Sequence, residues 1–266
     1  MLIVVKGAGD IASGIALRLH HAGFPVLMTD IERPLCVRRT VSFCEAVRLG
    51  CCTVEDTEAV RISVPEEASA VIAVGKIPVL VDEQAECIGI LKPDAVIDAI
   101  LAKRNLGTKI TDAPVVIGVG PGFCAGKDCH AVIETKRGHT LGRVIRSGEP
   151  IPNTGVPGNI GGFTTERVLR APANGVFRGV CKISDVVRKG ETVAYVNDIP
   201  VPATIDGVLR GLLADGIEVT EGLKIGDIDP RAAVENCFTC SDKALSVAGG
   251  ALEAVCGLLK ERRFAE

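Results

Sequence analysis

Short apolar runs alternate with helical spacing over the first part of the chain. Leu2–Val5 is a continuous apolar run, Ile11, Ile15 and Leu19 then recur at helical spacing, and Pro25–Met28 is a second run. Such runs are typical of parallel strands that are buried on both faces and joined by helices. Further runs of this kind are Val79–Val81, Ala95–Ala99 and Pro114–Val119. The pattern therefore predicts an α/β domain over residues 1–150, built on a mostly parallel sheet.

The turn after the first apolar run has the glycine spacing of dinucleotide-binding folds. Gly7-x-Gly9-x-x-Ala12 leads into the helical stretch, and Asp30 lies 21 residues beyond Gly9. In that fingerprint the glycines make a tight turn and admit a phosphate, and the acid bonds a ribose hydroxyl. We therefore expect a Rossmann-like domain whose candidate cofactor-binding residues are Gly7, Gly9, Asp10, Ala12, Ser13 and Asp30. Because the Asp10 carboxylate would repel a phosphate, the alternative is a unit whose glycines serve only packing.

Two other segments are candidates for the same cofactor site. Arg38 and Arg39 could grip a phosphate or carboxylate beside the ribose position, and a solvated basic turn is the alternative. Gly118, Gly120 and Gly122 form a second glycine-rich turn at the end of a strand, where the ligand crevices of open α/β sheets lie. The positive charges expected along this edge are Arg38, Arg39, Lys127, Lys136 and Arg137. They favour an anionic, phosphate-bearing ligand.

No set of catalytic residues stands out from the sequence. His130 and His139 lie in a polar stretch, 127–143, which is either one edge of an anion or cofactor site or a solvated loop. The pair Cys237-x-x-Cys240 is a weak zinc signal because zinc takes four ligands, so we expect no metal site. Cys240 precedes a helical stretch and could take part in redox or sulfur chemistry, and inert thiols are the simpler interpretation.

The second half of the chain contains an internal repeat. Ala171–Gly190 and Ala203–Gly222 align at an offset of 32 residues, and both contain Gly-Val-(Phe/Leu)-Arg-Gly. Two related β halves of this kind resemble the barrel-sandwich fold of biotinyl and lipoyl carrier domains, which we expect over 166–232. The joining hairpin, Tyr195–Pro202, lacks the lysine that carriers modify, so we expect a docking or assembly module. A Gly/Pro-rich linker at 151–165 precedes this domain, and a C-terminal helical segment at 233–266 follows it.

Composition and charge narrow the classes of partner. Across 266 residues the formal net charge is −3 and aromatic residues make up 3%, which argues against a nucleic-acid partner. The longest apolar uncharged run, Ala113–Gly126, has 14 residues, whereas a membrane span needs roughly 20. The N-terminus lacks a signal-peptide pattern and the 11 cysteines are scattered, so a cytoplasmic protein with mostly reduced thiols is expected. The oligomeric state stays open, a homo-oligomer included.

Six ordered motifs extend over nearly the whole chain. They are Lys6–Gly14, Arg38–Phe43, Ala102–Asn105, Gly118–Phe123, Glu134–His139 and Ser241–Ala244. Together they resemble the YqeB family of accessory proteins of selenium-dependent molybdenum hydroxylases. The resemblance implies a role in maturing or supplying the molybdenum cofactor, with the hydroxylase or cofactor-assembly proteins as partners. The ligand would be a nucleotide or a molybdopterin dinucleotide, whose pyrophosphate the Gly7–Gly14 turn could hold.

Two other functions stay open. An NAD(P)-dependent oxidoreductase explains the fingerprint and Asp30 but leaves the repeat domain unexplained, and its acid or base would be His130 or His139. A carrier or scaffold protein would leave the glycine turns as packing features. These patterns do not decide whether the protein catalyses a reaction.

Overall fold

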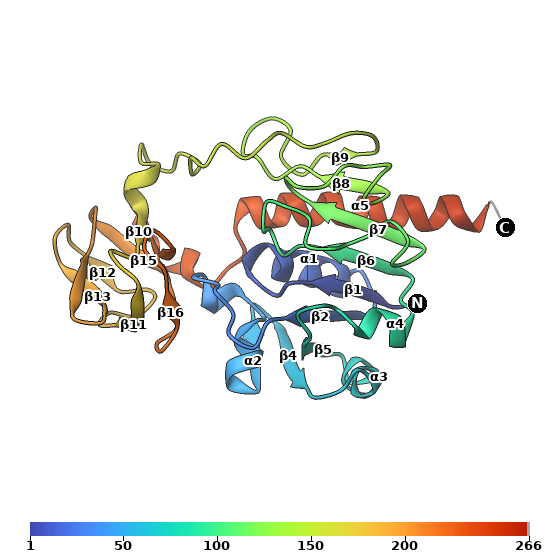
Figure 1. Ribbon diagram of the computed structural model, residues 1–266, viewed down its shortest axis with the longest axis horizontal. Helices are drawn as coiled ribbons and strands as arrows, with labels where there is room; N and C mark the ends of the chain where they lie inside the picture. Colours follow the sequence, from blue (N-terminus) through green and yellow to red (C-terminus); the bar gives the residue numbers. More distant parts are fainter. Residues whose placement is uncertain (265–266) are drawn as a thin grey trace. The chain divides into compact units, whose positions relative to one another are not determined.

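One large sheet dominates the first of two units. The computed structural model describes residues 1–264; its first unit takes in 1–34, 43–154 and the segment from Cys240, and its second takes in 35–42 and 155–239. Among the described residues the sheet has the order β3-β4-β5-β2-β1-β6-β7-β8-β9 (Figure 1). The strands from β4 to β8 in this order pair in parallel, and β3 and β9 add antiparallel edges. The predicted α/β architecture with a mostly parallel sheet is confirmed.

The strands of this sheet follow the apolar runs of the sequence. They are β1 (Ile3–Lys6), β2 (Val26–Asp30), β3 (Cys51–Val54), β4 (Thr57–Ile62), β5 (Ile77–Val81), β6 (Ala95–Asp98), β7 (Val115–Val119), β8 (Ala131–Ile133) and β9 (Val144–Ile145). The central strands are buried on both faces because helices or loops cover each side.

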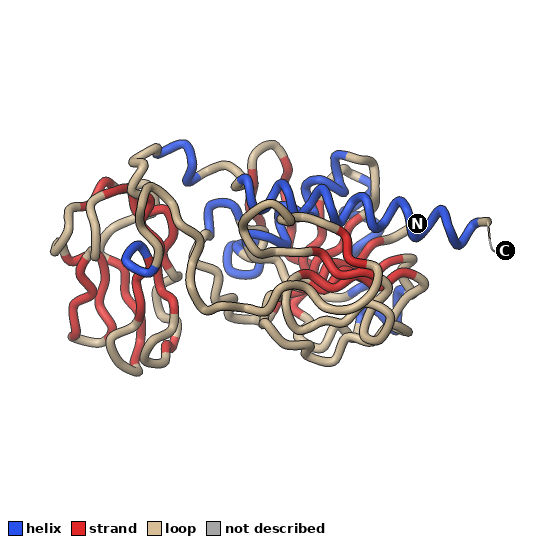
Figure 2. Tube along the Cα trace, turned by 90° about the horizontal axis from the view of Figure 1, so that it is seen from above, coloured by secondary structure: helices blue, strands red, loops and turns tan. Residues whose placement is uncertain are grey.

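Two long helices cover one face of the sheet. α1 (Asp10–His21) and α5 (Asp242–Arg263) pack against each other, and α5 also contacts β7, β8 and β9 (Figures 1 and 2). On the other face Val4, Val96 and Val116 belong to a core cluster that α3 and α4 help to cover. The shorter helices are α2 (Glu45–Leu49), α3 (Ala68–Ala73) and α4 (Cys87–Leu91), and the 3₁₀ turns are η1 (Arg39–Val41), η2 (Pro65–Glu67), η3 (Thr165–Arg167) and η4 (Val234–Cys237). Across residues 1–264, no helix combines the length and apolar character that crossing a bilayer requires.

Glycines let α5 approach its neighbours closely. A Cβ on Gly14 of α1 would come within 3.0 Å of the Ala244 Cβ, which is tighter than most side-chain contacts. A Cβ on Gly250 would collide with the carbonyl oxygen of Gly142, in the loop before β9. On the same side of α5, Val247 and Ala251 are completely buried. The last helix of the chain is therefore an integral layer of the first unit.

The second unit consists of two four-stranded antiparallel sheets. Their orders are β10-β17-β15-β12 and β14-β13-β11-β16 among the described residues. The strands are β10 (Val168–Arg170), β11 (Gly175–Gly179), β12 (Val186–Val187), β13 (Thr192–Val196), β14 (Ile199–Pro202), β15 (Gly207–Leu212), β16 (Glu218–Val219) and β17 (Lys224–Asp229). The halves of the repeat pair crosswise, because β11 pairs with β16 and β12 pairs with β15. Phe177, Leu209 and Ile225 contribute to the core between these strands.

The assignment of this unit to the biotinyl/lipoyl-like barrel-sandwich fold is wrong. That assignment assumed a module built from one continuous segment, whereas this unit also takes in Leu35–Ser42. The Leu212 N–H donates to the Val37 carbonyl at 2.7 Å, and Gly211 leaves room for that segment because a Cβ would stand 3.1 Å from the Val37 oxygen. The repeated residues do not distinguish that fold, because most are glycines and valines, which mark turns and strands in any antiparallel β structure.

Candidate functional site

The first glycine turn and Asp30 meet at the carboxyl ends of β1 and β2. Gly7 has a φ of +91°, which L side chains rarely adopt, and a Cβ there would stand 3.1 Å from the Ala99 carbonyl oxygen. The Ala8 N–H donates to Asp30 Oδ2 at 2.9 Å, and the Ile31 N–H donates to Oδ1 at 2.8 Å. Burial raises the pKa of Asp30, and these two main-chain hydrogen bonds oppose the rise. The acid therefore lies against the turn, which is where a ribose-binding acid is required.

The N-terminus of α1 has no side-chain cap in the described chain. Gly9 occupies the N-cap position with φ −74° and ψ −176°, an extended conformation that any residue adopts. Ser, Thr, Asp and Asn are preferred there because their side chains bond the first N–H groups of the helix. α5 follows that preference, since Ser241 accepts from the Ala244 N–H at 3.1 Å. The conformation of Gly9 thus does not require glycine, and the residue has no side chain to bond the first N–H groups of α1.

Three further candidate residues lie in the first turns of α1. Ser13 is completely buried; its hydroxyl donates to the Ala8 carbonyl at 3.1 Å and accepts from the Phe43 N–H at 2.8 Å. These bonds hold the turn in place. Ala12 is 1% exposed, in keeping with the small residue that the fingerprint places where helix meets strand. Asp10 is half-buried in the first turn, where its charge favours the helix dipole.

The second glycine turn follows β7 at the same edge of the sheet. A Cβ on Gly118 would collide with the ring of Phe123. Gly120 has a φ of +82° and would place a Cβ 2.8 Å from Thr135 Oγ1, and Gly122 has a φ of +109°. Each of these glycines is therefore explained by backbone conformation or by packing.

Arg38 and Arg39 are held within the second unit. Arg38 is 4% exposed, and its Nη2 donates to the carbonyl oxygens of Asn236 at 2.8 Å and Thr239 at 3.3 Å. Arg39 Nε donates to the Leu212 carbonyl at 2.8 Å. These bonds tie the 35–42 segment to β15 and η4, a role that the local sequence could not reveal.

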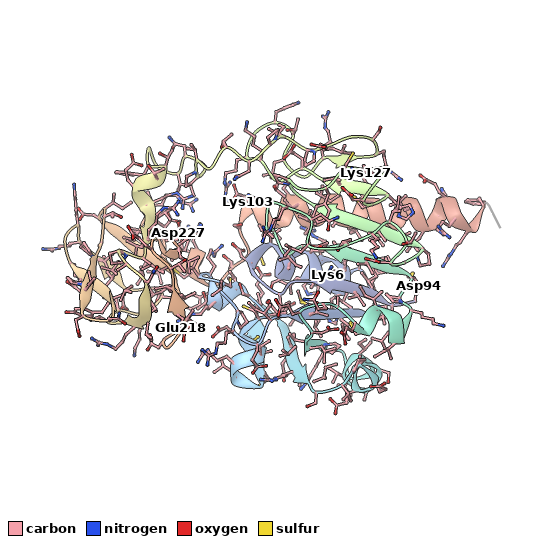
Figure 3. All side chains as sticks on the ribbon, viewed as in Figure 1. Lys6, Asp94, Lys103, Lys127, Glu218 and Asp227 are labelled. Carbon is pink, nitrogen blue, oxygen red and sulfur yellow. The ribbon has the colours of Figure 1, made fainter. Side chains whose placement is uncertain are left out.

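A cluster of charged groups surrounds the start of α5 at the carboxyl edge. Burial lowers the pKa of Lys243, and so do the positive charges of Arg137 and Lys103, while the carboxylates of Asp10 and Glu134 oppose the change. The five groups come from α1, α5 and the loops after β6 and β8, and Figure 3 labels Lys103 at this end of the sheet. The sequence analysis gave Lys243 and Lys103 no role of their own. The available signal was the position of Lys243 in the first turn after an N-cap serine.

The carboxylates of Glu134 and Asp242 in this region already have partners. Glu134 is 2% exposed; its Oε1 accepts from the Lys136 N–H at 2.7 Å and its Oε2 from the Ile151 N–H at 2.8 Å. Asp242 forms a two-pronged ion pair with Arg137, at 2.6 and 3.0 Å. Lys136 and Arg137 thus follow β8 at the expected edge, and Arg137 is engaged by α5.

Two predicted polar residues lie at the opposite edge. Lys127 and His130 precede β8, which runs parallel to β7, so they stand at the amino ends of the strands. Figure 3 accordingly shows Lys127 and Lys103 at different ends of the sheet. His130 Nδ1 accepts from the Val116 N–H at 3.0 Å, and burial lowers its pKa with help from the charge of Arg262. Neither residue is placed to act at the Gly7 turn.

A broad cleft lies on the face of the sheet near α4. Its volume is about 1110 Å³, and its lining includes α4, Lys6 and the crossover 99–114, which the structure describes without a helix. Lys6 is 6% exposed; its Nζ donates to Thr108 Oγ1 at 2.6 Å and lies 3.4 Å from Asp98 Oδ2. The Thr108 hydroxyl donates to the same Asp98 oxygen at 2.6 Å. This buried network, which the sequence analysis missed, ties the crossover to β1 and β6.

The cysteines form no disulfides in the part of the chain that the structure describes, and several are shielded from solvent. Burial raises the pKa of Cys52 and Cys87 to about 12 and that of Cys129 to about 11, so these thiols stay protonated at neutral pH. Burial also raises the pKa of Cys237, which lies in the second unit whereas Cys240 lies in the first. Within residues 1–264, no three His, Cys, Asp or Glu side chains are grouped so as to hold a metal ion.

Comparison with known proteins identifies a relative over almost the whole chain. The chain is 52% identical over 260 residues to the Escherichia coli (strain K12) protein described as "Uncharacterized protein YqeB". The chain is therefore similar to YqeB over nearly its whole length. The alignment covers 98% of this chain and 48% of YqeB, so the chain spans about half the length of that relative. No protein-family model matches the chain.

The solved structures that are similar to this chain have low sequence identity to it and low TM-scores. An aspartoacylase family protein from Mesorhizobium loti is 12% identical, with a TM-score of 0.29 and coverage of 85% of this chain and 84% of its own. A succinylglutamate desuccinylase/aspartoacylase from Rhodobacter sphaeroides is 22% identical, with a TM-score of 0.22, and covers 32% of this chain and 29% of its own. Both TM-scores are below 0.5, so neither match carries an argument about the fold or the function of this chain.

Proposed function

We propose that this protein binds a phosphate-bearing nucleotide at the Gly7–Asp10 turn and acts as an accessory protein in maturing selenium-dependent molybdenum hydroxylases. The observation that best supports the binding role is that the N-terminus of α1 has no side-chain cap. Gly9 stands where a capping side chain is favoured, although its φ of −74° does not require glycine. A phosphate bound to the first-turn N–H groups would take the place of the absent cap. The maturation role rests on the family resemblance.

The residues at the turn fit a dinucleotide. A pyrophosphate would be held by the main chain of Gly9 and the first turn of α1, and Asp30 stands beside Ala8 to receive ribose hydroxyls. A molybdopterin dinucleotide offers both groups and would bring the molybdenum chemistry with it. The chain's own contribution at this edge is to bind and orient the nucleotide half.

Gly9→Val is expected to abolish nucleotide binding without unfolding the protein. The φ and ψ of Gly9 suit any residue, whereas a branched side chain at the N-cap would occupy the space that a phosphate needs. The affinity should fall about 100-fold or more, equivalent to about 3 kcal/mol. Calorimetric titration with NAD, NADP, ATP, CTP and a cytidine dinucleotide measures it.

The control is Gly249→Val, at a helical position of α5 where a Cβ would meet no atom within 4 Å. It should bind like the wild type, and both variants should melt near the wild-type temperature. If the wild type binds none of the five compounds, the nucleotide site is refuted.

The maturation role is tested in cells. In a strain without this protein we expect the partner hydroxylase to be present but inactive, with an incomplete cofactor. Wild-type protein should restore activity, and Gly9→Val should not. Hydroxylase activity and the molybdenum, selenium and pterin content of the purified hydroxylase are the measurements. Normal activity and content in the deletion strain would contradict the role.

The alternative is an NAD(P)-dependent oxidoreductase, which shares the nucleotide site and for which His130 or His139 is the expected acid or base. His130 stands at the amino edge of the sheet, and its Nδ1 is engaged by the Val116 N–H. His139 is exposed in the loop after β8. Selective binding of NAD or NADP in the titration, with hydride transfer to a substrate, would favour this alternative.

A further inference from the structure

The cleft near α4 stands where most α/β domains have a crossover helix. Strands β6 and β7 pair in parallel, and parallel neighbours are usually joined through a helix. The crossover 99–114 contains no helix, and the cleft of about 1110 Å³ lies beside it on the α4 face of the sheet. A volume of this order suits a small organic molecule, since ligand pockets measure about 300–1,000 Å³. The residues that line the cleft all belong to the first unit.

The crossover is held in a fixed shape although it has no helix. Asn105 Oδ1 accepts from the Gly107 N–H at 2.9 Å and the Thr108 N–H at 2.8 Å, and Asn105 Nδ2 donates to the Thr108 carbonyl at 2.8 Å. Leu101 and Lys103 have φ values of +61° and +62°, a left-handed conformation that costs energy and clusters at ligand sites. One wall of the cleft is therefore formed before any ligand binds.

Lys6 lies on the floor of this cleft, and its contacts fix the position of its amine. Val4 belongs to the core on the α4 face, and Lys6, two residues further along β1, projects from the same face. The Lys6 Nζ donates to Thr108 Oγ1 at 2.6 Å and lies 3.4 Å from Asp98 Oδ2, and Lys6 is 6% exposed. Within residues 1–264 this ammonium group makes no other hydrogen bond or ion pair. Because an ammonium group has three N–H donors, this buried side chain keeps donor capacity for a ligand in the cleft that it lines.

Asp98 determines the charge of the ligand that Lys6 can bind. Asp98 is 2% exposed and already balances the charge of Lys6. A ligand carboxylate at Lys6 would place a second anion beside Asp98, which is unfavourable in a buried site. A neutral carbonyl or amide oxygen would accept the same N–H without that repulsion. The charged side chains around the cleft are also balanced, with three cations and three carboxylates: Lys92, Lys109, Arg262, Glu83, Glu86 and Asp112.

The walls of the cleft offer apolar contacts. Ile100 is 37% exposed and Leu106 is 46% exposed, and both belong to the crossover. Ile88 of α4 and Ile110 are half-buried in the same lining. Large aliphatic side chains that stay accessible around a buried donor match a ligand with a polar oxygen and an apolar body.

We propose that this cleft binds a small uncharged molecule whose carbonyl or amide oxygen accepts a hydrogen bond from Lys6 and whose apolar body packs against the aliphatic walls. The cleft is separate from the start of α1, because α1 lies on the other face of the sheet. Binding in the cleft therefore requires no nucleotide at the Gly7–Asp10 turn.

The direct test is an NMR titration of the full chain with two probes of matched shape, phenylacetamide and phenylacetate. The neutral amide should bind saturably and shift the main-chain amide signals of 83–93 and 106–114. The anion should bind about 10-fold more weakly or not at all, because its carboxylate would face Asp98. Binding of the amide that does not saturate, shifts confined to other parts of the chain, or equal affinity for the two probes would overturn the proposal.

Gly89→Phe should block the cleft without unfolding the protein. Gly89 of α4 lines the cleft, and a Cβ there would meet no atom within 4 Å, so the ring has room to enter. Gly249→Phe is the matched control, at an exposed position of α5 where a Cβ also meets no atom within 4 Å. The affinity for phenylacetamide should fall at least about 10-fold in Gly89→Phe and stay unchanged in the control. Wild-type affinity in Gly89→Phe would place the probe outside the cleft and contradict the proposal.

The role of Lys6 is tested by combining Lys6→Met with Asp98→Asn. The double variant removes both charges, because removing Lys6 alone would leave Asp98 buried without its partner. The affinity for phenylacetamide should fall about 10-fold, the usual loss for one hydrogen bond to a charged group. Thermal melting shows whether the double variant is folded, and Gly89→Phe, which keeps the network intact, tests the cleft if it is not. Wild-type affinity in a folded double variant would refute the role of Lys6.

Discussion

Gly250→Ala is expected to destabilise the first unit by about 1–3 kcal/mol, or more if the backbone has to move. A Cβ at this position would collide with the Gly142 carbonyl oxygen and crowd Ile133 of β8, at 3.1 Å. The obstacle is backbone, which cannot rotate away as a flexible side chain could. α5 would have to move away from the sheet and expose the apolar surface that Val247 and Ala251 bury.

The neighbouring Gly249→Ala variant is the control. Gly249 lies in the same helix, but a Cβ there would meet no atom within 4 Å. Alanine should therefore stabilise α5 by about 0.5–1 kcal/mol through its helix propensity. Urea unfolding followed by circular dichroism measures both variants. Equal stability of the two would show that α5 does not approach the loop before β9 as closely as described.

Asp227→Ala is expected to destabilise the second unit by about 3–5 kcal/mol, the usual effect of removing one partner from a buried ion pair. Asp227 is 1% exposed and receives the Arg167 guanidinium on Oδ1 and the Arg210 guanidinium on Oδ2, the latter at 3.0 Å. Both arginines are more than nine-tenths buried. Without Asp227, Arg167 would lose its carboxylate partner inside the β unit.

Asp198→Ala is the matched control for this variant. Asp198 is exposed in the turn between β13 and β14, and its removal should leave the midpoint of unfolding within about 0.5 kcal/mol of the wild type. Thermal and urea unfolding provide the comparison. A loss below about 1 kcal/mol for Asp227→Ala would mean that the network contributes no more than a surface pair.

The same network sets the response of the second unit to acid. Burial alone would raise the pKa of Asp229, but hydrogen bonds from Arg231 and the charges of Arg210 and Arg231 lower it overall. A lowered pKa in the folded state gives a stabilisation that is present above the ordinary pKa of aspartate. It is lost as the pH falls through the lower folded-state value.

The local sequence pattern was sufficient to predict the parallel sheet and the position of the first glycine turn. The run predicted at Leu2–Val5 became β1 at Ile3–Lys6, and Pro114–Val119 became β7 at Val115–Val119. These predictions succeeded because buried parallel strands are continuous apolar runs that need no long-range information. The spacing from Gly9 to Asp30 placed the acid beside the turn for a similar reason, since one helix and one strand fix the number of residues between them.

Long-range packing was not visible in the sequence. Arg38 and Arg39 follow β2 closely, yet their guanidinium groups bond carbonyls of Leu212 and Asn236, far away in sequence. Nothing in a basic dipeptide tells which distant carbonyls it meets. The helical segment at the end of the chain was predicted as a separate element, but the small residues that dock it on α1, Gly14 and Ala244, stand 230 positions apart. The sequence did not single out Lys243, because the charged groups near it come from four separate segments.

The order in which the segments are synthesised has a consequence for how the first unit folds. Its strands and α1 leave the ribosome early, whereas α5, which covers β7, β8 and β9, follows only after the whole second unit. Until then α1 has no partner helix, and an apolar face of the nascent sheet is open to chaperones or to aggregation. The second unit, which needs only 35–42 from the earlier part, can form while the first is still incomplete. The 22-residue helix α5 can therefore dock onto the first unit only after the second unit has been synthesised.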